Sequence, residues 1–171
     1  MRKHWNIIST VALLGSAFVT TDVLAQSTTV SHGRITAVRQ EDTLRLSQRR
    51  FTYLPNDSGQ TWLIPVNLRT FTAGGESRTV SVLMDSPEMR IDLGGETIAY
   101  KLNDGQTGFY RVQYASPDDL RQLGERVRQK TLPAEDRWGL QNDLYALALA
   151  GDVGIDDYLA FLEHFRAEDS Y

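Results

Sequence analysis

The side chains most able to do chemistry are few in this sequence. Its 171 residues include three histidines, His4, His32 and His164, and no cysteine. A catalytic zinc site needs about three protein ligands and one open position, often supplied by a His-Glu-x-x-His repeat on a helix. That repeat is absent, and the histidines are far apart in the chain. We therefore expect no cofactor, no metal site and no cysteine chemistry in this chain.

Other catalytic and binding patterns are also missing. A serine hydrolase of the Gly-x-Ser-x-Gly type is excluded, because that string does not occur. Asp152, Asp156 and Asp157 lack the spacing and the final glutamate of a calcium loop, and we interpret them as residues near helix starts. Gly74-Gly75 and Gly94-Gly95 are not followed by Lys-Ser or Lys-Thr, so neither predicts a phosphate loop.

The charge balance argues against nucleic acid as a partner. The chain carries 18 Lys and Arg against 22 Asp and Glu, a formal net charge of −4. Binding to a phosphate backbone needs a concentrated positive surface. The densest basic cluster is Arg45, Arg49 and Arg50, which alternation along a strand divides between two faces. We expect no nucleic-acid binding.

Residues 1–25 are predicted to be a secretory signal peptide. Arg2 and Lys3 precede an apolar run from Ile7 to Val19, which is too short to cross a bilayer comfortably, and Val23-Leu24-Ala25 offers a cleavage site. The alternative is a buried first strand or helix. A signal implies export to a bacterial periplasm or cell exterior, with no stable membrane span after its removal. Without a signal, the chain is expected to be cytoplasmic.

Residues 26–115 are predicted to form a β-sandwich domain. From about residue 33 onward, apolar and polar residues alternate in short runs, and clusters of Gly, Asn, Asp and Pro separate these runs. Six to eight strands of this kind are typical of an antiparallel sandwich. Pro65 interrupts one run and favours an edge strand or a bulge there. The clearest runs are Leu44–Ser47, Phe51–Tyr53, Trp62–Leu68, Thr79–Val82, Met89–Leu93, Ile98–Leu102 and Phe109–Tyr114.

Residues 116–171 are predicted to form about three α-helices, so the fold is a sandwich followed by helices, α+β overall. Ser116-Pro117 begins the first helix, and the second begins near Pro133 and ends at Gly151. A third helix opens near Asp156. Its buried side is expected to comprise Ile155, Tyr158, Leu159, Leu162 and Phe165. We interpret this region as the truncated start of an α-helical C-terminal domain.

Several strings together resemble the M1-family zinc aminopeptidases. Leu46–Phe51 is similar to Q-x-R-F, and Trp62–Val66 is similar to W-x-[IV]-P-[VL]. Lys101–Tyr114 resembles K-x-N-x-x-x-x-G-F-Y-R-V-x-Y, and Leu132–Asp143 resembles L-x-x-x-D-R-x-G-L-x-x-D. The resemblance covers about residues 33–165, and its strings follow one another in the family's order.

The resemblance implies a particular part of that family. The region corresponds to the β-sandwich and the beginning of the ERAP1-like helical C-terminal domain, whereas the zinc ligands and the G-x-M-E-N string belong to a catalytic domain upstream. Neither H-E-x-x-H nor G-x-M-E-N occurs here. We expect a non-catalytic structural or substrate-access region that is inactive alone, with zinc confined to the intact family. Possible partners are a catalytic M1 domain or a peptide.

Two alternatives remain, a free-standing exported module that binds a peptide or protein, and the non-catalytic half of a split aminopeptidase. In each case we interpret the motif residues as packing and domain-junction residues, and expect Arg137 to pair with a neighbouring carboxylate. These residues are Gln48, Arg50, Phe51, Trp62, Pro65, Asn103, Gly108, Phe109, Tyr110, Arg111, Tyr114, Asp136, Arg137 and Asp143.

Overall fold

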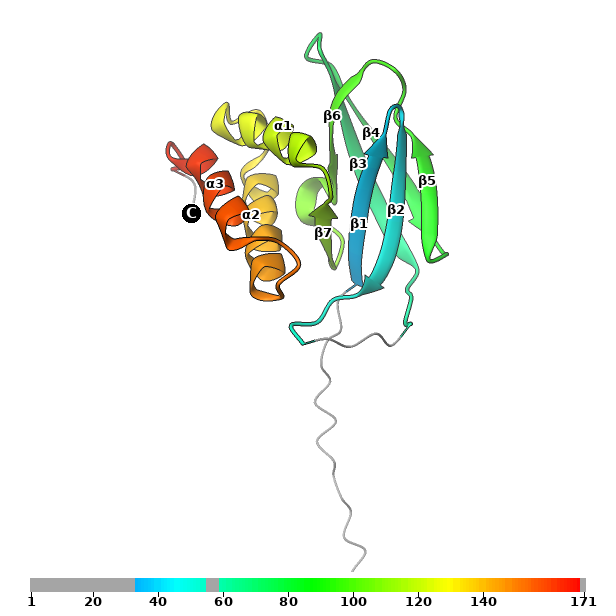
Figure 1. Cartoon of the computed structure of the whole chain (residues 1–171). Helices are drawn as coiled ribbons and strands as arrows, with labels where there is room; N and C mark the ends of the chain where they lie inside the picture. Colours follow the sequence, from blue (N-terminus) through cyan, green and yellow to red (C-terminus); the bar gives the residue numbers. More distant parts are fainter. Residues whose placement is uncertain (1–32, 55–58, 170–171) are drawn as a thin grey trace, which may run out of the picture.

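The computed structural model describes residues 33–54 and 59–169. The predicted signal segment, residues 1–25, lies outside them. The described residues form seven strands followed by three α-helices, as the sequence predicts (Figure 1). The strands are β1 (Gly33–Gln40), β2 (Thr43–Arg50), β3 (Ile64–Thr72), β4 (Ser77–Met84), β5 (Glu88–Asp92), β6 (Thr97–Leu102) and β7 (Tyr110–Tyr114).

The strands form two facing sheets. One sheet has the order β5-β2-β1-β7 and the other has the order β4-β3-β6. All neighbouring pairs are antiparallel except β1 and β7, which run parallel with Gly33 opposite Tyr110. The predicted antiparallel sandwich is thus confirmed, with this one parallel pair in it. The two strands are far apart in the sequence, so no hairpin constrains their relative direction.

The core follows from alternation along the strands. In β2, Leu44 and Leu46 are fully buried while Arg45 between them is exposed. The matching inward residues of β3 include Val66 and Leu68, from the opposite sheet. Because successive side chains point to opposite faces, each strand contributes every second residue to the core.

Two sequence expectations about the strands fail. Phe51–Tyr53 is not a strand, because β2 ends at Arg50. β3 is the central strand of its sheet rather than an edge strand. Pro65 is tolerated there because β6 pairs with β3 only from Leu68 onward, so the stretch around Pro65 has β4 as its one strand neighbour.

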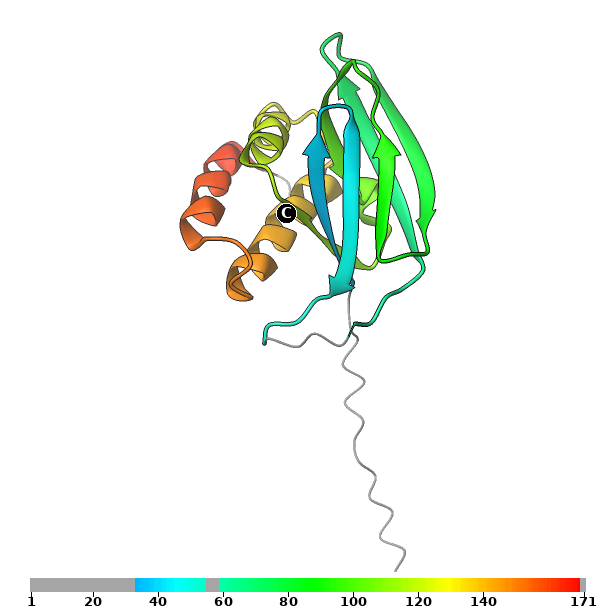
Figure 2. The same ribbon diagram turned by 45° about the vertical axis from the view of Figure 1, so that its right-hand side comes forward.

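The helices lie together on one side of the sandwich, next to β6 and β7 (Figures 1 and 2). They are α1 (Pro117–Arg128), α2 (Ala134–Leu149) and α3 (Ile155–Leu162). Most of their buried apolar side chains join the sandwich core in one cluster, while Ala146 and Leu147 pack with Phe51 in a second. Tyr158 and Phe161 form the buried side of α3, whereas Ile155 and Leu159, expected to be buried, are exposed. Within residues 33–54 and 59–169, no helix is long and apolar enough to span a membrane.

Candidate functional site at the junction of sandwich and helices

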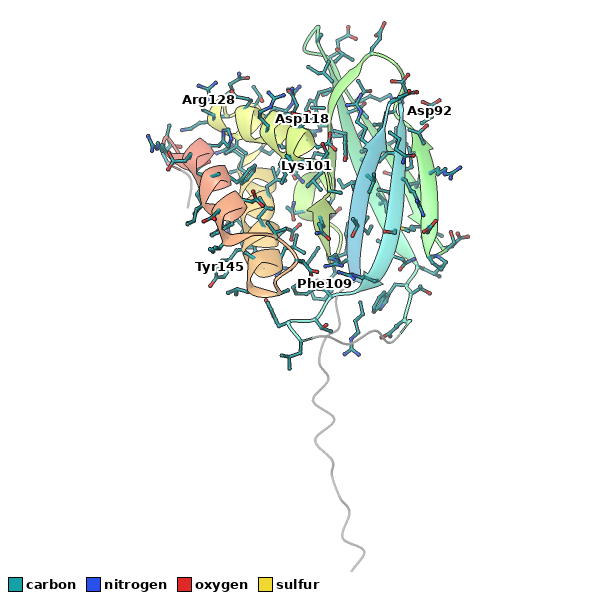
Figure 3. The ribbon with its side chains drawn as sticks, viewed as in Figure 1. Asp92, Lys101, Phe109, Asp118, Arg128 and Tyr145 are labelled. Atoms are coloured by element: carbon teal, nitrogen blue, oxygen red, sulfur yellow. The ribbon has the colours of Figure 1, made fainter. Side chains whose placement is uncertain are left out.

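A buried ion pair joins the sandwich to the helices. Lys101 of β6 and Asp136, in the first turn of α2, are both inaccessible to solvent, and Lys101 Nζ lies 2.8 Å from Asp136 Oδ1. The ammonium also donates to the carbonyl oxygens of Leu102 and Asn103 at 3.0 and 3.1 Å. Burial lowers the pKa of Lys101, and the Asp136 charge opposes that shift. Figure 3 labels Lys101 between the helices and the sandwich.

The loop after β6 is closed by Asn103. Its backbone has a φ of 54°, in the left-handed region that asparagine tolerates better than most residues. Its side chain accepts a hydrogen bond from the Gly108 N–H at 2.7 Å and donates one to the Gly108 carbonyl at 3.0 Å. A Cβ on Gly108 would lie 2.9 Å from that Asn103 oxygen, so this close approach requires glycine.

The closed loop is tied to α2 as well as to itself. The Gly105 N–H donates to Asp136 Oδ1 at 2.8 Å, so one carboxylate oxygen receives both the loop amide and the Lys101 ammonium. The other oxygen, Asp136 Oδ2, is buried without a hydrogen-bond partner. The position of the loop against α2 therefore depends on a single carboxylate that is far from water.

Asp143 lies two turns further along α2 and contacts the edge strand β7. Its carboxylate accepts hydrogen bonds from the Val112 backbone N–H at 3.0 Å and from Arg111 Nη1 at 3.1 Å. Burial raises the pKa of Asp143 to about 6, while these two donors act in the opposite direction. The helix thus accepts a hydrogen bond from an amide on the side of β7 that has no neighbouring strand. This contact also protects that edge of the sheet from other strands.

Two tyrosines link the sheets and α1. The Tyr114 hydroxyl, on β7, accepts a hydrogen bond from the Leu102 N–H on β6 at 3.0 Å. The Tyr100 hydroxyl donates to Asp119 of α1 at 2.8 Å. Burial raises the pKa of both tyrosines and of Asp119. These two hydrogen bonds join β6, β7 and α1 next to the Lys101 and Asp136 ion pair.

Arg137 pairs with a carboxylate, as the sequence predicts. Its Nε and Nη2 donate to the two oxygens of Glu168 at 2.5 and 2.8 Å. Its Nη1 also donates to the Leu132 carbonyl at 2.6 Å. The arginine therefore holds the segment after α3 against the beginning of α2, in a bidentate geometry.

The side chains of the remaining predicted residues, all within the described part of the chain, make no hydrogen bond with Lys101 or Asp136. The Gln48 amide bonds with both the N–H and the carbonyl of Trp62, at 2.8 and 2.9 Å. Phe51 packs on Ala146 and Leu147 of α2. Of the others, Arg50 is half-buried, Pro65 and Phe109 are exposed, and Tyr110 is buried with its ring beside Gly108.

The junction therefore brings together six of the fourteen predicted residues: Asn103, Gly108, Arg111, Tyr114, Asp136 and Asp143. The structural role of all fourteen stays a prediction. The site residues predicted from the sequence do not include Lys101, Tyr100 or Asp119. Lys101 is the first residue of the motif Lys101–Tyr114, which also contains Asn103. A lysine next to apolar residues in a predicted strand is the signal that indicates its burial.

A second contact holds the loop between α2 and α3 to β1 and β2, in the same sheet as β7. The Asp152 carboxylate pairs with Arg34 of β1 and with Arg49 of β2, the latter at 2.8 Å. Arg34 is nearly buried while Arg49 is exposed. This contact anchors α3 at the end of the sandwich away from Lys101 and Asp136.

The described residues do not fit a zinc ion. Within residues 33–54 and 59–169, no three His, Cys, Asp or Glu side chains are grouped so that they could hold a metal. His164 instead packs against helix α1, where a Cβ on Gly124 would lie 2.4 Å from its ring. We assign no chemical step to zinc in this part of the chain.

Comparison with known proteins finds similarity to aminopeptidases, and the family match takes in β7 and most of β6 as well as the helices. The family model of the ERAP1-like C-terminal domain matches residues 99–171. Probable aminopeptidase 2 of Sulfurisphaera tokodaii is 30% identical over 128 residues, which is 75% of this chain and 15% of the relative. Tricorn protease-interacting factor F2 of Thermoplasma acidophilum is 33% identical over 137 residues, 80% of this chain and 16% of the relative.

A puromycin-sensitive aminopeptidase of Caenorhabditis elegans is 31% identical over 136 residues, 75% of this chain and 14% of the relative. These matches make the described sandwich-and-helix arrangement similar in sequence to one segment of much longer aminopeptidases. The chain is related to the M1-type aminopeptidases and spans about 15% of the length of the relatives it matches.

Proposed function

We propose that this chain is a non-catalytic portion of an M1-type metallo-aminopeptidase, a class that removes N-terminal residues from peptides. The observation that supports this most strongly is the buried junction built around Lys101 and Asp136, which lies inside the region shared with aminopeptidases. A fully buried ion pair is weak evidence for stability, and we propose that this one instead fixes the arrangement of the groups around it. Its proposed role is to hold the helices at one angle to the sandwich.

A fixed angle matters for the proposed access role. Helices that limit the approach of a peptide to a catalytic domain must keep a fixed position. A displacement of about 1 Å in the groups that position a substrate can already lower the reaction rate substantially. Asp136, Asp143 and Asp119 each bind a group on a strand or loop of the sandwich, from two different helices. The proposed partner is therefore a catalytic M1 domain, placed relative to the helices by the sandwich.

A chimera tests this role. The corresponding segment of the Thermoplasma acidophilum relative is replaced by residues 33–169 of this chain, and aminopeptidase activity is measured with aminoacyl-amide substrates. We expect the chimera to retain measurable zinc-dependent activity, and the same chimera with Lys101→Met to lose most of it. An active chimera that is insensitive to Lys101→Met would contradict the positioning role.

The second candidate is a free-standing exported module that binds a peptide or protein. It is favoured by the large apolar cluster that the sandwich and the helices share, which would allow this part to fold alone. β4 has β3 as its one strand neighbour in the sheet and offers its other edge to an extended peptide. Cooperative unfolding of a monomer favours the module, whereas an H-E-x-x-H string in an adjacent reading frame favours a split enzyme.

A further inference from the structure

A cavity of about 330 Å³ lies between α1, α3 and the end of β7, away from the Lys101 and Asp136 junction. Its apolar surface comes from Leu120, Val153 and Phe161. Engineered apolar cavities of roughly 150 Å³ already bind benzene. The cavity therefore has room for an aliphatic or aromatic side chain together with the polar groups attached to it.

His164 and Asp152 line this cavity, and so do two ionisable side chains of opposite sign that come from different helices. Arg121 comes from α1 and Asp157 from α3. Within the described residues, Arg121 pairs with Asp118 on the same helix, at 3.3 Å, and both side chains are mostly exposed. Exposed pairs of this kind contribute little and are easily exchanged. Asp157 has no hydrogen bond or ion pair within the described part of the chain, whereas the lining residue Asp152 is held by two arginines.

We propose that this cavity binds a free α-amino acid with an apolar side chain, such as leucine or phenylalanine. The side chain occupies the apolar surface, the carboxylate meets the Arg121 guanidinium, and the ammonium meets the Asp157 carboxylate. A small apolar pocket with a few convergent polar groups is the usual form of a small-molecule site. Charges of both signs favour a zwitterion over a simple amine or acid. The proposal stands on this cavity and does not require the aminopeptidase role.

The ligand test compares leucine with two molecules of the same carbon skeleton. 3-Methylbutylamine lacks the carboxylate, and 4-methylpentanoate lacks the ammonium. Binding to the purified full chain is measured by titration with detection of amide shifts by NMR. We expect saturable leucine binding with a Kd of about 1 mM, typical of a ligand this small, and at least about 5-fold weaker binding of the other two. No saturable leucine binding, or equal binding of all three, would overturn the proposal.

Matched variants locate the site. Asp157→Asn and Arg121→Gln should each weaken leucine binding about 5-fold. Asp156→Asn and Arg128→Gln are the controls, because both side chains are exposed and neither lines the cavity. Figure 3 shows Arg128 at the opposite end of α1 from Asp118. The controls should bind leucine like the unaltered chain, and an equal effect of control and test variants would refute the assignment.

A third variant fills the cavity. Ala160 lines it but is exposed, so Ala160→Trp adds volume at the opening without displacing the core. Leucine binding should then be lost while thermal unfolding is unchanged. Retained binding would place the ligand elsewhere on the chain.

Discussion

The Lys101→Met substitution tests whether the buried ion pair holds the junction together. Methionine has a similar length, so the change removes the charge with little loss of packing. Asp136 would then remain fully buried with the Gly105 N–H as its one donor, since its second oxygen already lacks a partner. Removing one member of a buried pair typically destabilises a protein by about 3–5 kcal/mol. We expect a loss in this range.

The double variant Lys101→Met/Asp136→Leu separates the contribution of the ion pair from that of the hydrogen bond to Gly105. Replacing both charges by apolar groups is often nearly neutral, but the buried Gly105 N–H would lose its acceptor, at about 1–3 kcal/mol. The double variant should therefore be more stable than Lys101→Met alone. This non-additivity is the coupling that a double-mutant cycle measures.

The assay is urea unfolding followed by circular dichroism, with the free energy of unfolding taken from the midpoint and slope. Lys130→Met is the control, because Lys130 pairs with Asp169 at 2.7 Å on the surface. It should cost less than about 1 kcal/mol. If Lys101→Met destabilises no more than Lys130→Met, or if the double variant is the least stable, the reasoning about the junction is wrong.

Three further predictions concern neighbouring groups. Burial raises the pKa of Asp143 to about 6, above its unfolded value of about 3.9, so the native state binds more protons between these values. Unfolding free energy should rise by about 1 kcal/mol from pH 7 to pH 5, and urea titrations of Asp143→Asn should lack that rise. Gly124→Ala should lower the melting temperature, because its Cβ would lie 2.4 Å from the His164 ring; in a His164→Ala background the same change should instead raise it, through helix propensity. Asn103→Ala should destabilise more than Asn103→Gly, since both lose the bonds to Gly108 but only alanine resists a φ of 54°; equal urea midpoints would contradict this.

Local patterns were enough to predict much of the fold. Alternation such as Leu44-Arg45-Leu46 identified strands, and the change to helical spacing after Ser116 identified the first helix. The parallel pairing of β1 with β7 was not predictable, because it joins residues 33–37 to residues 110–114 and has no local signal. Ile155 and Leu159 share a helical face with apolar neighbours, but which face of α3 packs on α1 and α2 depends on tertiary contacts.

At the junction too, some features were predictable from local sequence and others depend on tertiary contacts. The turn composition of Asn103-Asp104-Gly105 and the pairing of Arg137 with an acid were accessible from residue types. The pairing of Lys101 with Asp136 was not, because many acids could neutralise a buried lysine and sequence separation does not choose among them. The ion pair forms only because β6 and the beginning of α2 pack against each other in the folded chain (Figure 3).

The most direct test of the proposed non-catalytic role is a joint measurement of zinc content and peptidase activity on the purified full chain. The chain is incubated with zinc and desalted, its bound metal is measured by mass spectrometry, and hydrolysis of leucyl-p-nitroanilide is followed with and without a chelator. We predict no stoichiometric zinc and no chelator-sensitive hydrolysis. Equimolar bound zinc together with turnover that the chelator abolishes would contradict the account.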